Sequence, residues 1–374
     1  TAGVASKAVV EAHNRAVGEA LEYLHAHAGY TRVHNSMTGM KDLQRLPGLV
    51  AAAYQHETSR EGDPHLHSHV ILFNKQGRDD GEMVSYDSKS LHDESRAAGM
   101  VYQATLRAEM HRLASLEMGK IDPSTGLGDI AGVPRDLIDA ASQRSTQLRE
   151  WAHEHLVVTD DHRLTAGQLS AAQKATRPSK PEHKPWAELR QEWADRFGAL
   201  EVDQAAQLKA RREREAVTVT VGQIARQAAA TIDKPAFTRA DLIEAIGARL
   251  PAVVEGAPFG PREQLEVLAD NVGMRITETR KPHQRERNEH YTVAPIIAEE
   301  AAVLGLIGAR NDRTALPDNA LELDELSPEQ ARVIGNIARS PWLIQTLSAP
   351  AGAGKTTSLR ALREGVHRAN PKGQ

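Results

Sequence analysis

The chain has 374 residues, no cysteine and a formal net charge of −4, with 40% hydrophobic and 26% charged residues. These are ordinary values for a globular protein of two or three domains, and they exclude disulfides, thiolate metal sites and nucleic-acid binding through a general basic excess. No apolar run is long enough to span a membrane, and the lack of cysteine fits a reducing cytoplasm, where we expect the protein.

The first 120 residues alternate between helical and strand patterns. An apolar stripe at helical spacing predicts a helix over 6–28, which Gly29 ends. The next predicted elements are strands at 48–56, 65–74 and 83–88, and a helix at about 95–118. The polar segment 57–64 joins the first two strands as a turn. This order predicts an α/β or α+β unit around an antiparallel hairpin.

The middle of the chain predicts linkers and helices. The proline-rich basic stretch 177–186 is typical of a solvated linker, and the charged stretch 209–215 predicts a helix or a second linker. A mostly helical segment follows over roughly 218–312, with Thr238 as an N-cap and a basic turn at 280–293 that leads into a short strand.

The last 50 residues carry their own pattern. Ser327 is a predicted N-cap, followed by Pro328 at the first helical position and Gln330 three residues after the cap. The apolar run 342–347 predicts a buried strand. The glycine-rich turn 348–357 comes next and opens a final helix.

Four histidines cluster around the predicted hairpin. If the two strands pair, His56 ends one strand where His67 and His69 lie on its neighbour, and cross-strand neighbours are about 5 Å apart. A set of His65, His67 and His69 is poorer, because its outer members would be about 13 Å apart along one strand. Three imidazole ligands leave coordination positions of the cation open, which is typical of a catalytic site where the cation polarises a carbonyl or phosphoryl oxygen.

The stretch "HETSREGDPHLHSHVILFN" closely resembles the metal motif of MobF-class (TrwC-type) conjugative relaxases, which are HUH endonucleases. The matching positions are His56, Thr58, Ser59, Arg60, Asp63, Pro64, His67 and His69. The resemblance extends over "EAHNRAV", "SQRSTQLREW" and "ATRPSKPEHKPWAELRQEWADRFG", so that it covers nearly all of residues 1–200. It implies a relaxase palm with a central antiparallel sheet flanked by helices.

The resemblance also implies a reaction and its components. A relaxase nicks single-stranded DNA at a plasmid transfer origin, where a tyrosine attacks a phosphate that the cation polarises. The family implies Mg or Mn, whereas the imidazole ligands favour Zn, Ni or Cu. The implied partners are origin DNA, the relaxosome and conjugation coupling proteins. Candidate phosphate contacts are Arg60, Arg144, Arg149, Lys174, Arg177, Lys180 and Lys184.

The family's nucleophilic tyrosines and catalytic aspartate precede the helix that begins here near Ser6. Tyr23 and Tyr30 match no family nucleophile, and Tyr102 is expected to be a packed helical aromatic. We therefore assign no catalytic residue. We expect a fragment, cut at both ends, that binds metal without nicking DNA.

The segment "APAGAGKT" (349–356) nearly fits the phosphate-binding loop pattern, with Ala349 in place of the first glycine. Residues 323–362 resemble the start of a RecD-like superfamily 1 helicase domain, which MobF relaxases carry after the nicking domain. The implied ATP and Mg site comprises Gly352, Gly354, Lys355, Thr356 and Thr357, with Gln330 reading adenine. The chain ends before the other helicase motifs, so we do not expect unwinding.

The prediction is therefore an α/β (α+β) protein in four parts: a relaxase domain (1–200), a charged linker (201–217), a mostly helical connecting domain (218–320) and the start of a P-loop domain (321–374). The alternative function is a non-catalytic DNA-binding module that keeps the metal site. A P-loop ATPase joined to an unrelated metal hydrolase would require two coincidences.

Overall fold

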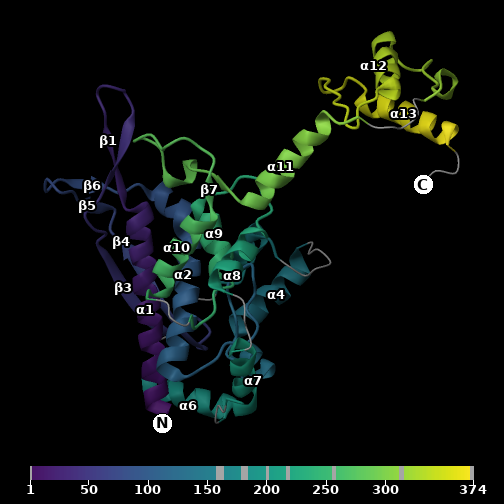
Figure 1. The fold of residues 1–374 in the computed structure, drawn as a ribbon. Helices are drawn as coiled ribbons and strands as arrows, with labels where there is room; N and C mark the ends of the chain where they lie inside the picture. The colour runs from purple at the N-terminus through teal and green to yellow at the C-terminus, as the bar shows by residue number, and fades with distance from the viewer. Residues whose placement is uncertain are drawn as a thin grey trace. The chain divides into compact units, whose positions relative to one another are not determined.

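A computed structural model describes residues 2–156, 164–177, 184–198, 202–215, 220–254, 258–310 and 316–370. The chain divides into two compact units, residues 1–293 and residues 294–374 (Figure 1). Among the described residues, no helix combines the length and the apolar character that crossing a bilayer requires.

Two long helices, α1 (Ala2–Ala28) and α2 (Ser88–Ala114), pack along each other in the larger unit (Figure 1). Both helices bury small residues, such as Ala12 and Ala97, which need little space between packed backbones. Helix α1 ends as predicted before Gly29, where an added Cβ would lie 2.6 Å from the carbonyl oxygen of His25. Helix α2 starts earlier than predicted, because the Asp87 side chain caps it.

All strand pairs in the described part of the chain are antiparallel and form two-stranded sheets. The pairs are β1 (Tyr30–His34) with β2 (Lys41–Arg45), β3 (Ala51–Thr58) with β4 (Pro64–Leu72), β5 (Lys75–Gly77) with β6 (Met83–Ser85), and β7 (Met274–Arg275) with β8 (Tyr291–Thr292). The predicted α/β (α+β) class with helix-flanked antiparallel strands is confirmed. The pairing is distributed over four small sheets rather than collected in one central sheet.

Shorter helices complete the larger unit. They are α3 (Arg135–Ala140), α4 (Gln143–His155), α5 (Ala166–Ala175), α6 (Trp186–Phe197), α7 (Gln204–Glu215), α8 (Val221–Ala229), α9 (Arg239–Gly247), α10 (Pro261–Val272) and the short 3-10 helix η1 (Glu286–Asn288). Thr238 caps α9 as predicted, in a capping box with Asp241.

The segment 201–217, predicted as a charged linker, differs from that prediction, because most of it forms α7. The buried Gln207 of this helix accepts a hydrogen bond from the backbone N–H of Glu117 and donates to the carbonyl oxygens of Glu117 and Ala131. Arg214 pairs with the carboxylate of Glu117. Tertiary contacts therefore fix a charged stretch that is ambiguous in the sequence.

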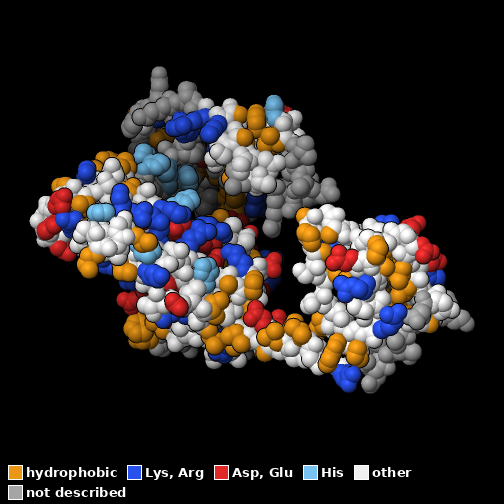
Figure 2. Space-filling view, turned by 90° about the horizontal axis from the view of Figure 1, so that it is seen from above, with side chains coloured by type: hydrophobic (Ala, Val, Ile, Leu, Met, Phe, Trp, Pro, Cys, Tyr) orange, Lys and Arg blue, Asp and Glu red, His pale blue; other side chains and the backbone are white. Residues whose placement is uncertain are grey.

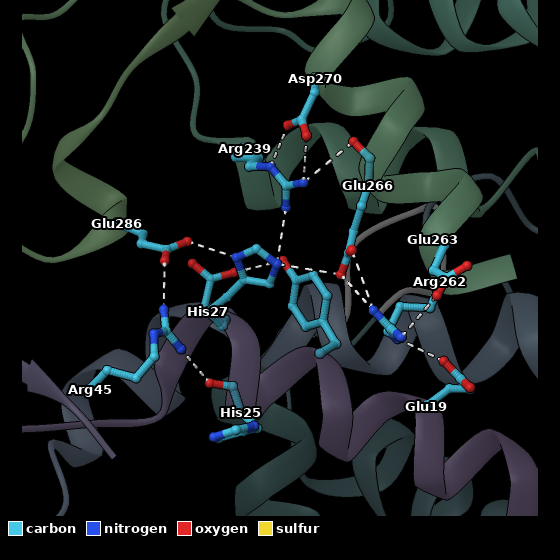
Figure 3. A network of polar contacts seen from close by, with 12 residues as sticks. Glu19, His25, His27, Arg45, Arg239, Arg262, Glu263, Glu266, Asp270 and Glu286 are labelled. Atoms are coloured by element: carbon cyan, nitrogen blue, oxygen red, sulfur yellow. Dashed lines mark hydrogen bonds and ion pairs between the residues drawn. The ribbon is translucent and has the colours of Figure 1, made fainter. Parts of the chain in front are cut away.

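The segment 218–293 lies in the same compact unit as 1–200, in contrast to the separate connecting domain that we predicted. Helices α9 and α10 pack against α2. The buried guanidinium of Arg107 donates to the carbonyl oxygens of Gly126, Gly247 and Leu250. A network of acidic and basic side chains also joins α1 to α9, α10 and η1 (Figure 3).

The smaller unit contains α11 (Ala294–Ile307), the 3-10 helix η2 (Asp318–Ala320), α12 (Pro328–Arg339) and α13 (Lys355–Ala369). The capping box of Ser327 and Gln330 is confirmed. The predicted strand at 342–347 is wrong: only Trp342 forms an isolated bridge, with Arg310. A buried parallel strand needs neighbouring strands on a sheet, and the described residues of this unit supply none.

Candidate metal centre and nucleic-acid cavity

The β3–β4 hairpin brings the three predicted ligand histidines together. His56 is directly opposite His67 in the register, and His69 follows two residues later on β4. Because side chains alternate between the faces of a strand, the three imidazoles lie on one face. The ring centroids are 5.3 Å apart for His56 and His67 and 5.1 Å apart for the other two pairs. The rings therefore converge as predicted, and their role as ligands stays a prediction.

The spacing of the rings fits a shared ion. Metal–nitrogen bonds of about 2.1 Å at a tetrahedral angle place two imidazole centres about 5.3 Å apart. However, no group of three or more His, Asp or Glu side chains in the described part of the chain is arranged to hold an ion as it stands. His56 and His69 are exposed, so their rings can turn toward a common point without disturbing the core.

His67 is oriented by the backbone of its own strand. Its Nδ1 lies 2.9 Å from the carbonyl oxygen of His65. A carbonyl oxygen only accepts hydrogen bonds, so Nδ1 carries the proton and Nε2 keeps its lone pair for an ion. The His65 ring stacks on that of His67, and burial together with the nearby His67 lowers the pKa of His65. His65 is therefore neutral near pH 7 beside the three candidate ligands.

The opposite face of β4 is held by α1 and α2. The buried His13 of α1 is hydrogen-bonded to Ser68 Oγ and to Tyr102 Oη, each at 2.8 Å. Burial, and then the nearby His67, lowers the pKa of His13. Because Ser68 faces away from the imidazoles, Tyr102 is a packed helical aromatic behind the hairpin, as we expected.

A cavity of about 1760 Å³ lies against the imidazole face. The hairpin and its turn line one side, and α4, α5 and α6 line the other. Figure 2 shows a group of histidine side chains with Lys and Arg side chains on either side of it. The lining contains six Lys and Arg residues against three glutamates, so the cavity is locally basic in an acidic chain: Arg60, Arg144, Lys174, Arg177, Lys184 and Arg196.

The predicted DNA contacts divide into several groups. Arg60, Lys174, Arg177 and Lys184 line the cavity, although Lys184 is paired with Glu192. Arg144 also lines it but donates to the carbonyl oxygens of Gln173 and Thr176 at the end of α5. Arg149 bonds Ser145 and does not line the cavity. Lys180 lies outside the described residues.

The contacts that join the hairpin to the helices of the far wall were missed from sequence. Asp63, 2% exposed, accepts hydrogen bonds from the backbone and side chain of Gln143 and pairs with Arg196 at 3.0 Å. Trp193 Nε1 donates to the carbonyl oxygen of Gly62 at 2.8 Å. Local patterns carry no signal for contacts between residues this far apart in sequence. Only the place of Asp63 within the histidine motif marked it.

Two of the tyrosines donate hydrogen bonds to glutamates, whereas a third is exposed beside the histidines. Tyr23 is buried and donates to Glu94, and Tyr30 donates to Glu286. Tyr54, which sequence reasoning did not consider, pairs with His69 in the register and is 55% exposed on the imidazole face. Strand alternation could have found it, because Tyr54 lies two positions before His56 and so shares its face of the strand.

The glycine-rich loop of the smaller unit has left-handed backbone at Gly352 and Gly354, with φ of +80° and +71°. The Lys355 Nζ donates to the carbonyl oxygens of Ala349 and Pro350, at 2.7 and 2.8 Å. Gln330 Nε2 donates to the carbonyl oxygen of Ala353, at 2.9 Å. The exposed Thr356 and Thr357 follow in the first turn of α13, whose N-terminal N–H groups favour an anion.

Comparison with known proteins identifies the relatives of both parts. A family model for TrwC relaxase matches residues 1–200, and one for an AAA domain matches residues 325–372. "Multifunctional conjugation protein TraI" of Escherichia coli is 32% identical over 184 residues, which is 46% of this chain and 10% of the relative. A second TraI, from strain K12, is 29% identical over 189 residues, 48% of this chain. The chain thus spans about a tenth of the length of the curated relatives it matches.

Solved structures of the conjugative relaxase TrwC are also similar to this chain. "Conjugative Relaxase TrwC in complex with OriT Dna. Metal-free structure" is 32% identical, with a TM-score of 0.44, and the match covers 52% of this chain and 66% of that chain. A copper-bound TrwC–oriT DNA complex is 31% identical, with a TM-score of 0.45, and the match covers 53% of this chain and 65% of that chain.

Proposed function

Because this chain belongs to the TrwC relaxase family, we propose that its larger unit binds a single DNA strand of a conjugative transfer origin in the basic cavity beside the β3–β4 hairpin. The observation that carries the proposal is the presence of three converging imidazoles and several Lys and Arg side chains in one cavity. Relaxosome and coupling proteins are the further partners that the family implies, and the cytoplasm is the proposed location.

We propose His56, His67 and His69 as ligands of a divalent cation. Their ring spacing and the fixed protonation of His67 Nδ1 support the assignment. Such a cation supplies Lewis-acid polarisation of a phosphoryl oxygen. Neutral imidazoles favour Zn, Ni or Cu over Mg, with Mn between them, so titration has to compare these ions.

The basic residues have a separate role from the imidazoles. Lys174 and Arg177 carry exposed charges at the end of α5, where they neutralise phosphates of a bound strand. The side chains of Tyr23, Tyr30 and Tyr102 are held by partners elsewhere in the unit. The proposal for this chain is binding of metal and DNA, with no catalytic residue assigned.

For the smaller unit, we propose that the 349–357 loop binds ATP with Mg. Lys355 leaves its loop carbonyls for the β/γ-phosphates, Thr356 and Thr357 lie at the start of the helix, and Gln330 reads adenine. The match of an AAA domain to residues 325–372 supports this assignment.

The test of the larger unit combines two titrations. Calorimetry with Mn²⁺ and Zn²⁺ compares the wild type with His67→Ala and with His92→Ala, an exposed histidine on α2. We expect the His67 variant alone to lose tight binding. Anisotropy of a labelled single-stranded 25-mer then compares Lys174→Ala/Arg177→Ala with Lys209→Ala/Arg212→Ala, exposed cations of α7 outside the cavity lining. Equal affinities of the two double variants would contradict the DNA proposal.

A further inference from the structure

The turn of the histidine hairpin ends at a buried carboxylate that reaches α4 and α6. Asp63 accepts hydrogen bonds from Gln143 N at 3.0 Å, Gln143 Nε2 at 2.8 Å and Arg196 Nη1 at 3.0 Å. It is 2% exposed. A carboxylate that is buried with several N–H donors and a cation is held strongly in one geometry.

Asp63 of the hairpin caps the N-terminus of α4. The residue at the N-cap position, Ser142, makes no side-chain capping bond. The carboxylate of Asp63 instead accepts from the first residue of the helix, Gln143. A negative charge at a helix N-terminus is also favoured by the helix dipole. The position of the first turn of α4 is thus set by a residue 80 positions away in the sequence.

The next residue along α4, Arg144, connects the first turn of α4 to the end of α5. Arg144 donates to the carbonyl oxygens of Gln173 and Thr176, at the end of α5. Lys174 and Arg177 lie beside these two acceptors and line the cavity. A continuous series of contacts therefore runs from Asp63 through the first turn of α4 to the two exposed cations.

We propose that Asp63 is a positioning residue that holds the Lys174 and Arg177 cations opposite the histidine site, so that a bound DNA strand contacts both. The inference rests on the proposed function, because it concerns how that cavity binds DNA. Asp63 itself is buried and does not line the cavity. Its contacts with Gln143 and Arg196 set the distance between the two walls.

The test is a double-mutant cycle on the full chain. Asp63→Asn keeps the size of the side chain but replaces an acceptor with an NH₂ group that faces the N–H donors. Asp139→Asn is the matched control, because it also breaks an Asp–Arg pair, with Arg135, but on an exposed helix. Arg196→Gln breaks the pair from the other wall, and Arg196→Lys keeps its charge. Each is combined with Lys174→Ala/Arg177→Ala.

We expect Asp63→Asn to weaken binding of the single-stranded 25-mer about ten-fold near 0.1 M salt. The negative slope of log K against log salt should become shallower by about 1.4, the value for two lost phosphate contacts. Adding Lys174→Ala/Arg177→Ala should have little further effect. Zn²⁺ affinity should match the wild type, and Arg196→Lys should recover part of the loss that Arg196→Gln causes. Hydrogen exchange should be faster at the Gln143 amide, a readout that needs no DNA.

An unchanged salt slope in both Asp63→Asn and Arg196→Gln would overturn the inference, and so would fully additive effects in the cycle. Loss of Zn²⁺ binding in both variants would also overturn it, since the effect would then be general disruption of the hairpin. A wild type that binds no DNA would instead reject the proposed function together with this inference, while faster exchange at Gln143 in Asp63→Asn would still show that the contact exists.

Discussion

His27 Nδ1 lies 2.9 Å from a carboxylate oxygen of Glu286, although the two residues are 259 positions apart in the sequence. Its Nε2 lies 3.4 Å from Glu266, and Arg239 approaches the same nitrogen at 3.3 Å (Figure 3). Burial lowers the pKa of His27, but the hydrogen bonds to Glu266 and Glu286 outweigh it and raise the pKa to about 9. The protonated imidazole therefore joins α1 to α10 and η1.

This pair predicts a pH-dependent stability. Below pH 6.5 His27 is protonated in the folded and unfolded states, and its stabilisation is fully present. As pH rises toward 9 the unfolded chain has lost this proton and the folded chain loses it in turn, so up to about 3 kcal/mol disappears. Urea unfolding at pH 6.5 and 9.5 measures the loss in the wild type.

His27→Gln should remove most of that pH dependence, and His92→Gln, at an exposed position of α2, should retain it. The facing charged and titratable groups are Glu266, Glu286, Arg239, Tyr23 and Glu94. If Arg239 donated to a neutral His27, the wild type and His27→Gln would show the same pH profile, and the assignment of a protonated imidazole would fail.

The buried Arg107 leads to a second prediction about the stability of the larger unit. Burial lowers the pKa of this guanidinium to about 10, and its bonds go to backbone carbonyls of Gly126, Gly247 and Leu250. Arg107→Met leaves these acceptors without their donor, and we expect a loss of about 3 kcal/mol in the free energy of unfolding. Arg112→Met, at an exposed position paired with Glu109, should cost under about 1 kcal/mol. Equal losses would contradict the prediction.

Local patterns in the sequence predicted what depends on short-range order. Alternation along β3 and β4 was sufficient to place three imidazoles on one face, and the spacing from Ser327 to Gln330 was sufficient for a capping box. The strand at 342–347 failed because the described residues of its unit supply no neighbouring strand. An apolar run alone cannot supply the inter-strand hydrogen bonds.

The contacts that were missed are long-range and polar. Asp63 reaches Gln143 across 80 positions, and Gln207 reaches Glu117 across 90. Nothing in the composition of either segment specifies such a pair, because both are fixed by how the helices pack. For the same reason the sequence did not reveal that 218–293 belongs to the first compact unit.

The phosphate-binding loop yields a prediction that separates two roles of one side chain. Gln330 Oε1 accepts from Ser327 N in the capping box, and Nε2 donates to Ala353 O. Gln330→Glu keeps the capping acceptor but loses the amide donor. We expect it to weaken ATP binding about ten-fold, with little change for GTP, in titrations with fluorescent nucleotides.

Lys355→Ala should weaken the binding of both ATP and GTP by at least about ten-fold, since a charge-assisted bond to phosphate is worth roughly 1.5–3 kcal/mol. Arg360→Ala, at an exposed position of α13, is the matched control and should bind normally. Equal weakening of ATP and GTP by Gln330→Glu would show that this residue supports the loop rather than reads the base.

The buried contact of His13 with Ser68 and Tyr102 gives the last prediction. His13→Ala leaves two hydroxyl groups without their partner behind β4, and we expect a loss of about 2–3 kcal/mol in urea unfolding. A cycle with Tyr102→Phe should give a coupling energy of about 1 kcal/mol, because Phe keeps the ring but removes the bonded hydroxyl. Tyr54→Phe, at an exposed tyrosine, is the control and should not couple to His13. Strictly additive losses for His13 and Tyr102 would mean that their hydrogen bond does not contribute to the attachment of β4.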